Sequence, residues 1–365
     1  MATARLATAR LAGLQRHWYR VTPLSLALLP ISFIFRLLAA TRRVLYRSGM
    51  LPSEKLPLPV IVVGNITVGG SGKTPLTLWL VQQLIANGWH PGIISRGFGG
   101  TAASPQAVYA SSDPAVTGDE AVLMAQRMLC PVWVGRDRPA AARELLRAHP
   151  ECDVILSDDG LQHYRLQRDV EIAVVDGVRR FGNGFLLPAG PLREPVARLA
   201  EVDAIVVHGG TATLDSYGSA SVAYRMQLHG EVFYNLLNPD TTAQAASFRG
   251  QRLHAIAGIG HPQRFFTHLH QLGLTVQAHS YPDHHCYAPG DLNYPDADAI
   301  LMTEKDAVKC AALSEQDNGS EQKYRSEQNN WAAEKCWVLR VDAQLDPALT
   351  QHILERITPH GRQTA

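Results

Sequence analysis

The first 53 residues of this 365-residue chain contain no aspartate or glutamate. This acid-free leader instead carries eight arginines: Arg5, Arg10, Arg16, Arg20, Arg36, Arg42, Arg43 and Arg47. Since the whole chain has a net charge of +1, the remainder carries −7, which is +1 minus +8. A value of that size is ordinary for a soluble protein, so the excess of positive charge is confined to the leader.

Cysteine is also scarce. The chain has five cysteines, far apart and without a C-x-x-C pair: Cys130, Cys152, Cys286, Cys310 and Cys336. An odd number of scattered thiols argues against a zinc or disulfide framework and indicates reduced thiols in a cytosolic compartment. With 46% hydrophobic and 18% charged residues, the composition is that of a globular protein with a normal core.

The leader lacks an uninterrupted apolar run. Its main apolar segment, residues 21–40, contains Arg36 and is broken by Pro23 and Pro30. A membrane-spanning helix needs about 20 apolar residues, so this segment is borderline for a span. An interfacial helix fits equally well, and a buried helix or a cleaved targeting peptide is a further alternative. Because an arginine near an anionic surface contributes about 1 kcal/mol, we favour association with the cytoplasmic face of a membrane.

Beyond the leader, strand-like and helix-like patterns alternate. We expect strands over residues 58–65, 91–95, 130–135, 152–160, 170–177 and 202–208. We expect helices over residues 74–87, 119–128 and 138–149. Branched apolar strands separated by helices predict an α/β fold with a doubly wound, mostly parallel sheet.

From about residue 210 the pattern changes and predicts a second, smaller α/β region. Residues 221–237 alternate like an antiparallel strand or hairpin, and residues 336–345 are typical of a last strand. The expected division of the chain is a membrane-association helix in 1–53, a nucleotide-binding core in 54–210 and a smaller domain in 211–365. Residues 313–334 are rich in Ser, Gln and Asn and predict a flexible insertion without chemistry.

The segment GNITVGGSGKTP, residues 64–75, nearly matches the phosphate-binding pattern G-x-x-x-x-G-K-[ST], but Thr67 replaces the opening glycine. With a strand before it and a helix after it, successive backbone N–H groups would point at phosphate oxygens. In such a loop Lys73 neutralises the β- and γ-phosphates and Thr74 binds Mg²⁺. The alternative, which we disfavour, is a glycine-rich turn without a ligand. The expected nucleotide contacts are Thr67, Gly69, Gly70, Ser71, Gly72, Lys73 and Thr74.

A phosphate loop also needs an acidic strand end that holds Mg²⁺. The strand over 152–160 delivers Asp158 and Asp159 to its carboxyl end, where ligands bind in sheets of this kind. Alone, such a pair is more often a solvated turn, but beside the loop a metal role is the better interpretation. The segment LMTEKD resembles a guanine-binding N/T-K-x-D motif, yet Lys305 lies two places after Thr303 instead of one. We therefore favour ATP over GTP.

Eight segments in this order carry a family resemblance: GNITVGGSGKTP, SRGFGG, TGDEAVLMA, SDDGLQH, LLPAGPLREP, AIAGIGHPQRFF, PDHH and MTEKDAVK. With the basic, apolar leader they resemble the tetraacyldisaccharide 4′-kinases, the membrane-bound kinases of lipid A biosynthesis. The resemblance runs from the leader to at least Lys309. The family's own loop carries threonine at the position of Thr67, so the missing glycine is typical of the family.

The resemblance implies ATP-dependent phosphorylation of the 4′-hydroxyl of a tetraacylated glucosamine disaccharide 1-phosphate, which gives lipid IVA. It implies a location at the cytoplasmic face of the inner membrane of a Gram-negative bacterium, on a surface with anionic lipids and without a nucleic-acid partner. The family's hydroxyl-activating pair falls by motif on Asp119 and His284, which lie in different parts of the expected division. Without the family, Asp119 is typical of a helix N-terminus and His284 of a turn.

Other roles that the resemblance implies are less specific. Glu194 is expected near the metal, Arg96 and Arg193 on phosphate groups, and Gln162 and His163 in the nucleotide or sugar pocket. Arginine suits phosphate because its guanidinium binds two oxygens at once. For both arginines the alternative is a structural salt bridge.

Two other classes of function compete with a lipid kinase. One is a membrane-associated ATPase that moves or positions a partner without phosphoryl transfer to lipid. It has no need for a hydroxyl-activating pair, so Asp119 and His284 favour the kinase. The other is a structural anchor with a vestigial loop, which we disfavour because Lys73, Thr74 and the acidic pair Asp158 and Asp159 are all present.

Overall fold

The computed structural model describes residues 17–127, 129–210, 221–315 and 334–361. Its contacts divide the chain into two compact units, each built from separate stretches of sequence. Unit 1 comprises Met1–Arg96, Cys130–Gln227 and Ala343–Ala365, and unit 2 comprises Gly97–Leu129 and Leu228–Asp342. The expected division was continuous, whereas residues 97–129 group with unit 2 and residues 343–365 with unit 1.

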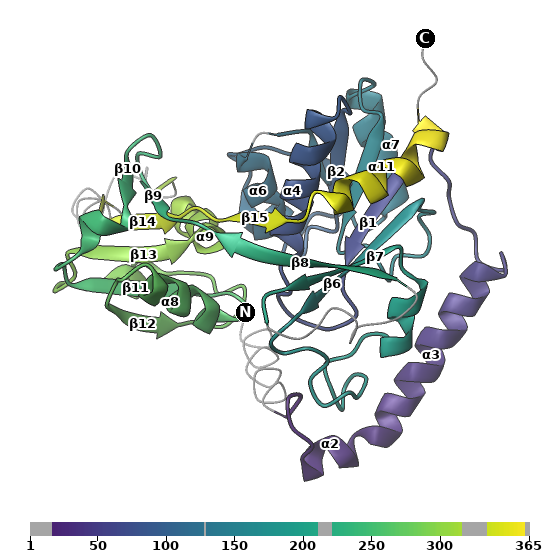
Figure 1. Ribbon diagram of the computed structural model, residues 1–365, viewed down its shortest axis with the longest axis horizontal. Coiled ribbons are helices and arrows are strands. Elements are labelled where there is room, and N and C mark those ends of the chain that lie inside the picture. Colours follow the sequence, from purple (N-terminus) through teal and green to yellow (C-terminus); the bar gives the residue numbers. More distant parts are fainter. Residues whose placement is uncertain (1–16, 128, 211–220, 316–333, 362–365) are drawn as a thin grey trace. The chain divides into compact units, whose positions relative to one another are not determined.

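Unit 1 contains a mostly parallel sheet with the strand order β15-β8-β7-β6-β1-β5-β2-β4. Figure 1 labels β1, β2, β6, β7, β8 and β15 of this sheet. Its strands are β1 (Val60–Gly64), β2 (Pro91–Ser95), β4 (Val132–Val134), β5 (Val154–Asp158), β6 (Val170–Asp176), β7 (Ala204–His208), β8 (Val222–His229) and β15 (Asp342–Leu345). Every pairing from β8 to β4 is parallel. All residues of β1, β2, β5 and β7 are buried, which explains their continuous apolar sequences.

Helices cover both faces of this sheet. The helices of unit 1 are α2 (Pro23–Ala27), α3 (Leu29–Arg47), α4 (Lys73–Ala86), α7 (Arg138–Ala148), α11 (Ala348–Gly361) and the 3₁₀ helix η1 (Val196–Glu201). Val60 and Val62 of β1 share a core with Leu145 of α7. Since α4 and α7 connect strands in opposite directions along the sheet, right-handed crossovers place them on opposite faces. The fold is thus doubly wound, as predicted.

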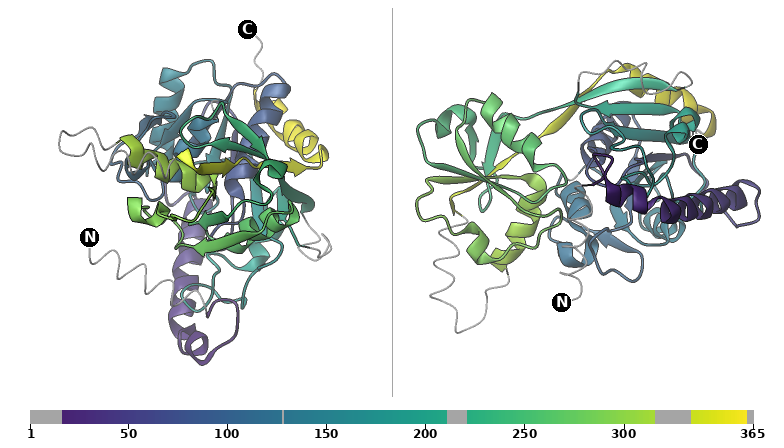
Figure 2. Two further views of the ribbon diagram at one scale, coloured as in Figure 1. Left: turned by 90° about the vertical axis from the view of Figure 1, so that its left-hand side faces the viewer. Right: turned by 90° about the horizontal axis from the view of Figure 1, so that it is seen from below.

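The leader forms a bent pair of helices, shown in purple in Figure 2. Thr22 caps α2, because its side chain accepts from the backbone N–H of Ser25 at 3.2 Å. Ser32 of α3 donates to the carbonyl of Leu186 at 2.8 Å, and Arg47 pairs with Glu201 at 3.1 Å. None of the helices in the described ranges combines the length and apolar character that crossing a membrane requires.

Unit 2 has its own sheet, with the order β10-β9-β14-β13-β11-β12. The helices and strands of unit 2 are β3 (Gln106–Val108), which is not part of this sheet, α5 (Pro114–Thr117), α6 (Asp119–Gln126), β9 (Val232–Asn235), β10 (Thr242–Gln244), η3 (Ala245–Phe248), β11 (Leu253–Ala257), α8 (Pro262–Gln271), β12 (Val276–Ser280), η4 (Pro289–Leu292), β13 (Ala299–Thr303), α9 (Glu304–Glu315) and β14 (Cys336–Leu339). The pairings β14-β13-β11-β12 are parallel, and those of β9 are antiparallel. Helices α8 and α9 pack in separate cores.

Residues 221–237, expected as an antiparallel strand or a hairpin, form two strands of different sheets, so the hairpin alternative is wrong. Strand β8 runs parallel to β7 in one sheet, whereas β9 pairs antiparallel with β14 in the other. Alternating apolar and polar residues indicate a half-buried strand but do not identify the strand that pairs with it. The periodicity therefore could not distinguish a hairpin from two strands in different sheets. Likewise, residues 336–345 form two strands of different sheets, β14 and β15. Of the expected insertion, residues 313–315 belong to α9, and 316–333 lie outside the described residues, as does Met128 of the expected helix over 119–128.

Candidate functional site

The glycine-rich loop leaves the central strand of unit 1. Strand β1 lies between β5 and β6, and Val63 is in register with Asp158. The chain passes from β1 to β2 on one side and later to β6 on the other, so β1 marks the point at which the strand order reverses. In open α/β sheets ligands bind at such a point, beyond the carboxyl ends of the strands. The sequence therefore brings the loop and the aspartate pair to one edge.

The loop is held in an open, left-handed path. Gly69 and Gly72 have φ values of 103° and 97°, whereas Thr67 is absent from the described non-glycine residues with positive φ. A glycine is thus unnecessary at position 67. Within the loop the Asn65 amide donates to the Gly69 carbonyl at 3.3 Å and to the Ser71 hydroxyl at 3.1 Å. Helix α4 begins at Lys73, so the loop amides precede a helix N-terminus, which favours anions.

Gly72 is the loop position least tolerant of a side chain. A Cβ atom there would lie 2.5 Å from Nδ1 of His208 and 2.9 Å from Cε of Met226. We expect Gly72→Ala to weaken ATP binding by about 10-fold or more, because left-handed strain alone costs about 1–3 kcal/mol. Calorimetric titration with ATP measures this. Gly184→Ala is the matched control, because Gly184 also has positive φ, 78°, but a Cβ there has nothing within 4 Å.

The aspartate pair at the end of β5 lies among cations. Asp159 is 3.7 Å from the Lys73 ammonium and accepts from Arg193 at 2.8 Å. Burial alone raises the pKa of Asp159, but Lys73 and Arg193 outweigh it and hold that pKa well below its usual range. Asp158 accepts from the Thr77 hydroxyl at 3.4 Å. The Arg138 guanidinium donates to the carbonyls of both aspartates, at 2.7 and 2.8 Å, and so fixes the turn.

Glu194 and Gln162 form a second polar group beside the loop. Gln162 donates to one oxygen of Glu194 at 2.8 Å and to the Asn65 carbonyl at 3.1 Å. The hydroxyl of Tyr164 donates to the other oxygen of Glu194. His163 follows in sequence, and burial together with Arg138 lowers its pKa to about 4, so its imidazole is neutral at physiological pH.

The two arginines expected on phosphate differ in their surroundings. Arg193 donates to Asp159 and, at 3.0 Å, to the Asn65 carbonyl, so the salt bridge considered as its alternative is present. Arg96 directly follows β2 and is exposed. Both lie in unit 1. Arg193 therefore stands at the loop with its charge already partnered by Asp159.

The residues present suit a magnesium ion. No three His, Cys, Asp or Glu side chains among the described residues gather as a metal-binding group. Mg²⁺, however, usually takes one or two carboxylates and completes its shell with water and substrate phosphates. Thr74, Asp158 and Asp159 offer the hard oxygen donors that such an ion prefers, close to Lys73. Both oxygens of Glu194, in contrast, already accept hydrogen bonds from Gln162 and Tyr164.

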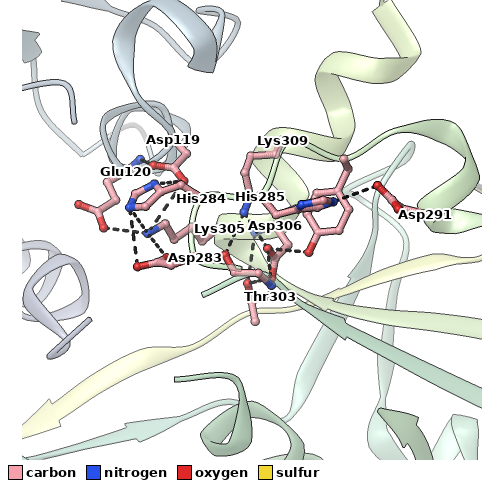
Figure 3. A network of polar contacts seen from close by, with 12 residues as sticks. Asp119, Glu120, Asp283, His284, His285, Asp291, Thr303, Lys305, Asp306 and Lys309 are labelled. Atoms are coloured by element: carbon pink, nitrogen blue, oxygen red, sulfur yellow. Dashed lines mark hydrogen bonds and ion pairs between the residues drawn. The ribbon is translucent and has the colours of Figure 1, made fainter. Parts of the chain in front are cut away.

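Asp119 and His284 meet within unit 2 (Figure 3). His284 Nδ1 lies 3.0 Å from Asp119 Oδ2, although 165 residues separate them in sequence. Asp119 is the first residue of α6, with its side chain 5% exposed, so it also occupies the helix N-terminus that the sequence allowed. His284 has a φ of 59°, a strained value for a non-glycine residue. The neighbouring His285 turns instead to Asp291, at 3.0 Å.

Charged groups around this pair keep Asp119 ionised. Burial raises the pKa of Asp119, but the hydrogen bond from His284 and the positive charge of Lys305 outweigh burial and lower it. Glu120 and Asp283 complete the cluster: they lie 3.0 and 3.3 Å from the Lys305 ammonium. From the sequence, Lys305 has no predicted role: it belongs to the segment LMTEKD, whose spacing does not match a guanine-binding motif. The feature of the sequence that could have indicated a role is its position two residues after β13, because functional side chains often follow the carboxyl ends of parallel strands.

Known proteins resemble this chain over most of its length. The sequence model of the family described as tetraacyldisaccharide-1-P 4′-kinase matches residues 24–358. The chain belongs to this family. The match covers α3, the glycine-rich loop and the segments that contain Asp119 and His284.

Bacterial relatives span nearly the same length as this chain. The tetraacyldisaccharide 4′-kinase of Methylobacillus flagellatus is 50% identical over 94% of this chain and 96% of its own. That of an Azoarcus species is 51% identical, covering 96% of both. Among solved structures, LpxK from Aquifex aeolicus in complex with ATP has a TM-score of 0.71 and 27% identity, covering 92% of this chain and 99% of that one.

Proposed function

We propose that this chain transfers the γ-phosphoryl group of ATP to the 4′-hydroxyl of a tetraacylated glucosamine disaccharide 1-phosphate. The observation that carries the proposal is the buried Asp119–His284 contact of 3.0 Å, present in a chain that also has an intact phosphate loop. An ATPase that only moves a partner needs the loop but not a carboxylate with a histidine beside it. Family membership supports the same reaction.

In this proposal the loop residues from Thr67 to Thr74 bind the phosphates of ATP. Their backbone N–H groups face the phosphate oxygens, and the Lys73 ammonium neutralises charge as the γ-phosphoryl group leaves. Thr74, Asp158 and Asp159 would hold Mg²⁺, which supplies further charge neutralisation when bound. Glu194 acts behind them by orienting Gln162, while Gln162 and His163 line the pocket.

Asp119 acts as the general base. A sugar hydroxyl is a weak nucleophile, and an ionised carboxylate within hydrogen-bond reach accepts its proton as the hydroxyl oxygen bonds to phosphorus. The lowered pKa of Asp119 ensures that the carboxylate is ionised near neutral pH. His284 orients the carboxylate through its Nδ1 contact. Arg96 is the candidate for the acceptor's existing 1-phosphate, because it is exposed whereas Arg193 already pairs with Asp159.

The test is transfer of label from [γ-³²P]ATP to a detergent-solubilised tetraacyl disaccharide 1-phosphate. We expect label in the lipid, and ATP consumption that depends on the lipid acceptor. A matched acceptor that lacks the 4′-hydroxyl should take up no label. ATP hydrolysis that proceeds equally without acceptor and leaves the lipid unlabelled would instead favour the transport-type ATPase.

We also propose that α3 lies along the cytoplasmic surface of the inner membrane, where an acylated substrate has its headgroup. The large apolar side chains of this helix are exposed, among them Phe33 at 66%, Leu37 at 59% and Leu38 at 65%. Phe33 and Leu37, four residues apart, lie on the same side of the helix, and Leu38 widens that apolar face by about 100°. The arginines Arg20 and Arg36 add attraction to anionic lipids.

The triple variant Phe33→Ser, Leu37→Ser and Leu38→Ser is expected to bind anionic vesicles about 100-fold or more weakly. Full burial of one such side chain contributes about 1.5–3 kcal/mol, so losing three fully buried side chains costs about 4.5–9 kcal/mol, more than the about 2.7 kcal/mol of a 100-fold change. Sedimentation with vesicles of phosphatidylethanolamine and phosphatidylglycerol measures the change. Val178→Ser with Val222→Ser is the control, because both valines are exposed on unit 1 outside the leader. Equal binding by the triple variant would contradict the proposal.

A further inference from the structure

Lys305 is the centre of the charged cluster in unit 2, and its surroundings differ from those of a surface ion pair. It is the second residue of α9, directly after β13, and its side chain is 16% exposed. Its ammonium lies 3.0 Å from Glu120, 3.3 Å from Asp283 and 3.9 Å from Asp119. One largely buried cation thus faces three carboxylates that come from α6 and from the segment after β12 (Figure 3).

The same ammonium lies 3.4 Å from Nε2 of His284. Lysine has three donors and no acceptor, so this contact is favourable only when Nε2 carries a lone pair. The proton of a neutral imidazole then resides on Nδ1, which donates to Asp119 Oδ2 at 3.0 Å. The competing acceptor for a proton on Nε2 is Asp283, whose oxygen is 3.8 Å away.

We propose that Lys305 is a positioning residue for phosphoryl transfer, holding His284 in its Nδ1–H tautomer and Asp119 in its ionised form. The inference rests on the proposed function, because it concerns the same base. Lys305 acts through the other two side chains and need not touch the acceptor. Without Lys305, three carboxylates and an imidazole would share one partly buried site, and uptake of a proton would reduce the repulsion between the carboxylates.

The other charged groups facing Asp119 do not replace Lys305. Glu120 and Asp283 are negative and oppose ionisation of Asp119. Lys309, one turn further along α9, also favours the ionised form, but it pairs with Asp306 at 2.9 Å and donates to the Gly258 carbonyl at 3.1 Å. Burial lowers the pKa of the Lys305 ammonium, yet Glu120 and Asp119 more than compensate and raise it, so the cation persists across the working pH range.

The first test is the pH dependence of kcat/KM for the full-length enzyme with Lys305→Met. Removing the cation raises the pKa of Asp119, so the acidic limb of the profile is expected to move to higher pH by about one unit or more. Activity should recover at pH values above the shifted limb. Lys305→Arg, which keeps the charge, should shift the limb less. A loss of the same factor at every pH would show a purely structural role and overturn the proposal.

Glu120→Gln is the opposite test and remains available if Lys305→Met fails to fold. Removing one carboxylate beside Lys305 should move the acidic limb of the kcat/KM profile to lower pH, so that the variant stays active at pH values where the activity of the wild type declines. Lys335→Met is the control, because Lys335 lies in the same unit but donates to the Ala297 carbonyl at 2.7 Å, outside the cluster. A shift of the limb to higher pH in Glu120→Gln would contradict the proposal.

A second readout does not depend on kinase activity. Nitrogen-15 NMR of histidine-labelled protein, with the His284 signals assigned by their loss in His284→Gln, reports which ring nitrogen carries a proton. We expect the Nδ1–H tautomer in the wild type and protonation of Nε2 in Lys305→Met. If the lipid is never phosphorylated, the proposed function fails while this result still stands. An unchanged tautomer in Lys305→Met would overturn the role of Lys305 alone.

Discussion

Asp119→Asn is expected to lower phosphoryl transfer to the lipid acceptor by about 10²–10⁴-fold, the usual contribution of a general base. Asparagine has the same shape and still offers an oxygen to His284, but it cannot take the hydroxyl proton. The loss should therefore appear in kcat, while the affinity for ATP, measured by titration, stays within about twofold because the phosphate loop belongs to unit 1. The assay is label transfer from ATP at saturating acceptor.

Asp113→Asn is the matched control. Asp113 lies six residues before Asp119 and caps α5, where its side chain accepts from the backbone N–H of Ala115 at 2.8 Å. Asparagine caps a helix as well as aspartate does, so this variant removes the same charge from the same segment without loss of structure. Transfer by Asp119→Asn within threefold of the wild type would exclude Asp119 as the base and favour a reaction in which the hydroxyl attacks unaided.

Local sequence patterns predicted much of the fold. The strands β1, β2, β4, β5, β6 and β7 and the helices α4, α6 and α7 lie where apolar runs and periodicity indicated them. Parallel strands buried on both faces have an unmistakable composition, and the loop after β1 has a fixed spacing of glycines before Lys73. The doubly wound sheet follows from that alternation.

Pairing between distant segments was not accessible in the same way. The alternating residues 221–237 do not reveal that β8 joins β7 while β9 joins β14. Nor does local pattern indicate that α6 packs with α9 in unit 2, and so brings Asp119 to His284 within one unit. The β9–β14 and α6–α9 contacts join residues more than 100 positions apart, and the β7–β8 pairing joins Ala204 to Val222 in a register that composition and periodicity do not specify.

The candidate functional residues also differ in whether local sequence patterns could predict them. Lys73, Asp158 and Asp159 could be inferred from residue type and from their place at strand ends. Asp119 and His284 came only from the family resemblance, since a helix-start aspartate and a turn histidine are common. Lys305 had no assigned role, because its significance lies entirely in the four side chains that surround its ammonium.

Lys73→Met is expected to lower kcat by about 10³-fold, comparable to removing a key stabilising donor at a reacting centre. The ammonium stands at the start of α4, where its charge would meet the oxygens of the group being transferred. The Lys73 ammonium also lies 3.7 Å from Asp159, so binding ATP would exchange this carboxylate partner for a phosphate. Because that exchange costs part of the ion pair with Asp159, the larger effect should appear in the rate and the smaller in ATP affinity.

Lys55→Met is the control. Lys55 precedes β1, so this substitution removes one positive charge from unit 1 at a position outside the loop. The double variant Lys73→Met with Asp159→Asn separates two causes of any loss. If the single variant were inactive only because Asp159 is left less compensated, neutralising Asp159 would restore the rate. We expect no restoration, because the transferred phosphoryl group itself requires the positive charge. Measured label transfer by Lys73→Met at the wild-type rate would contradict a phosphate-binding role for the loop and, with it, the assignment of unit 1 as the ATP-binding part of the chain.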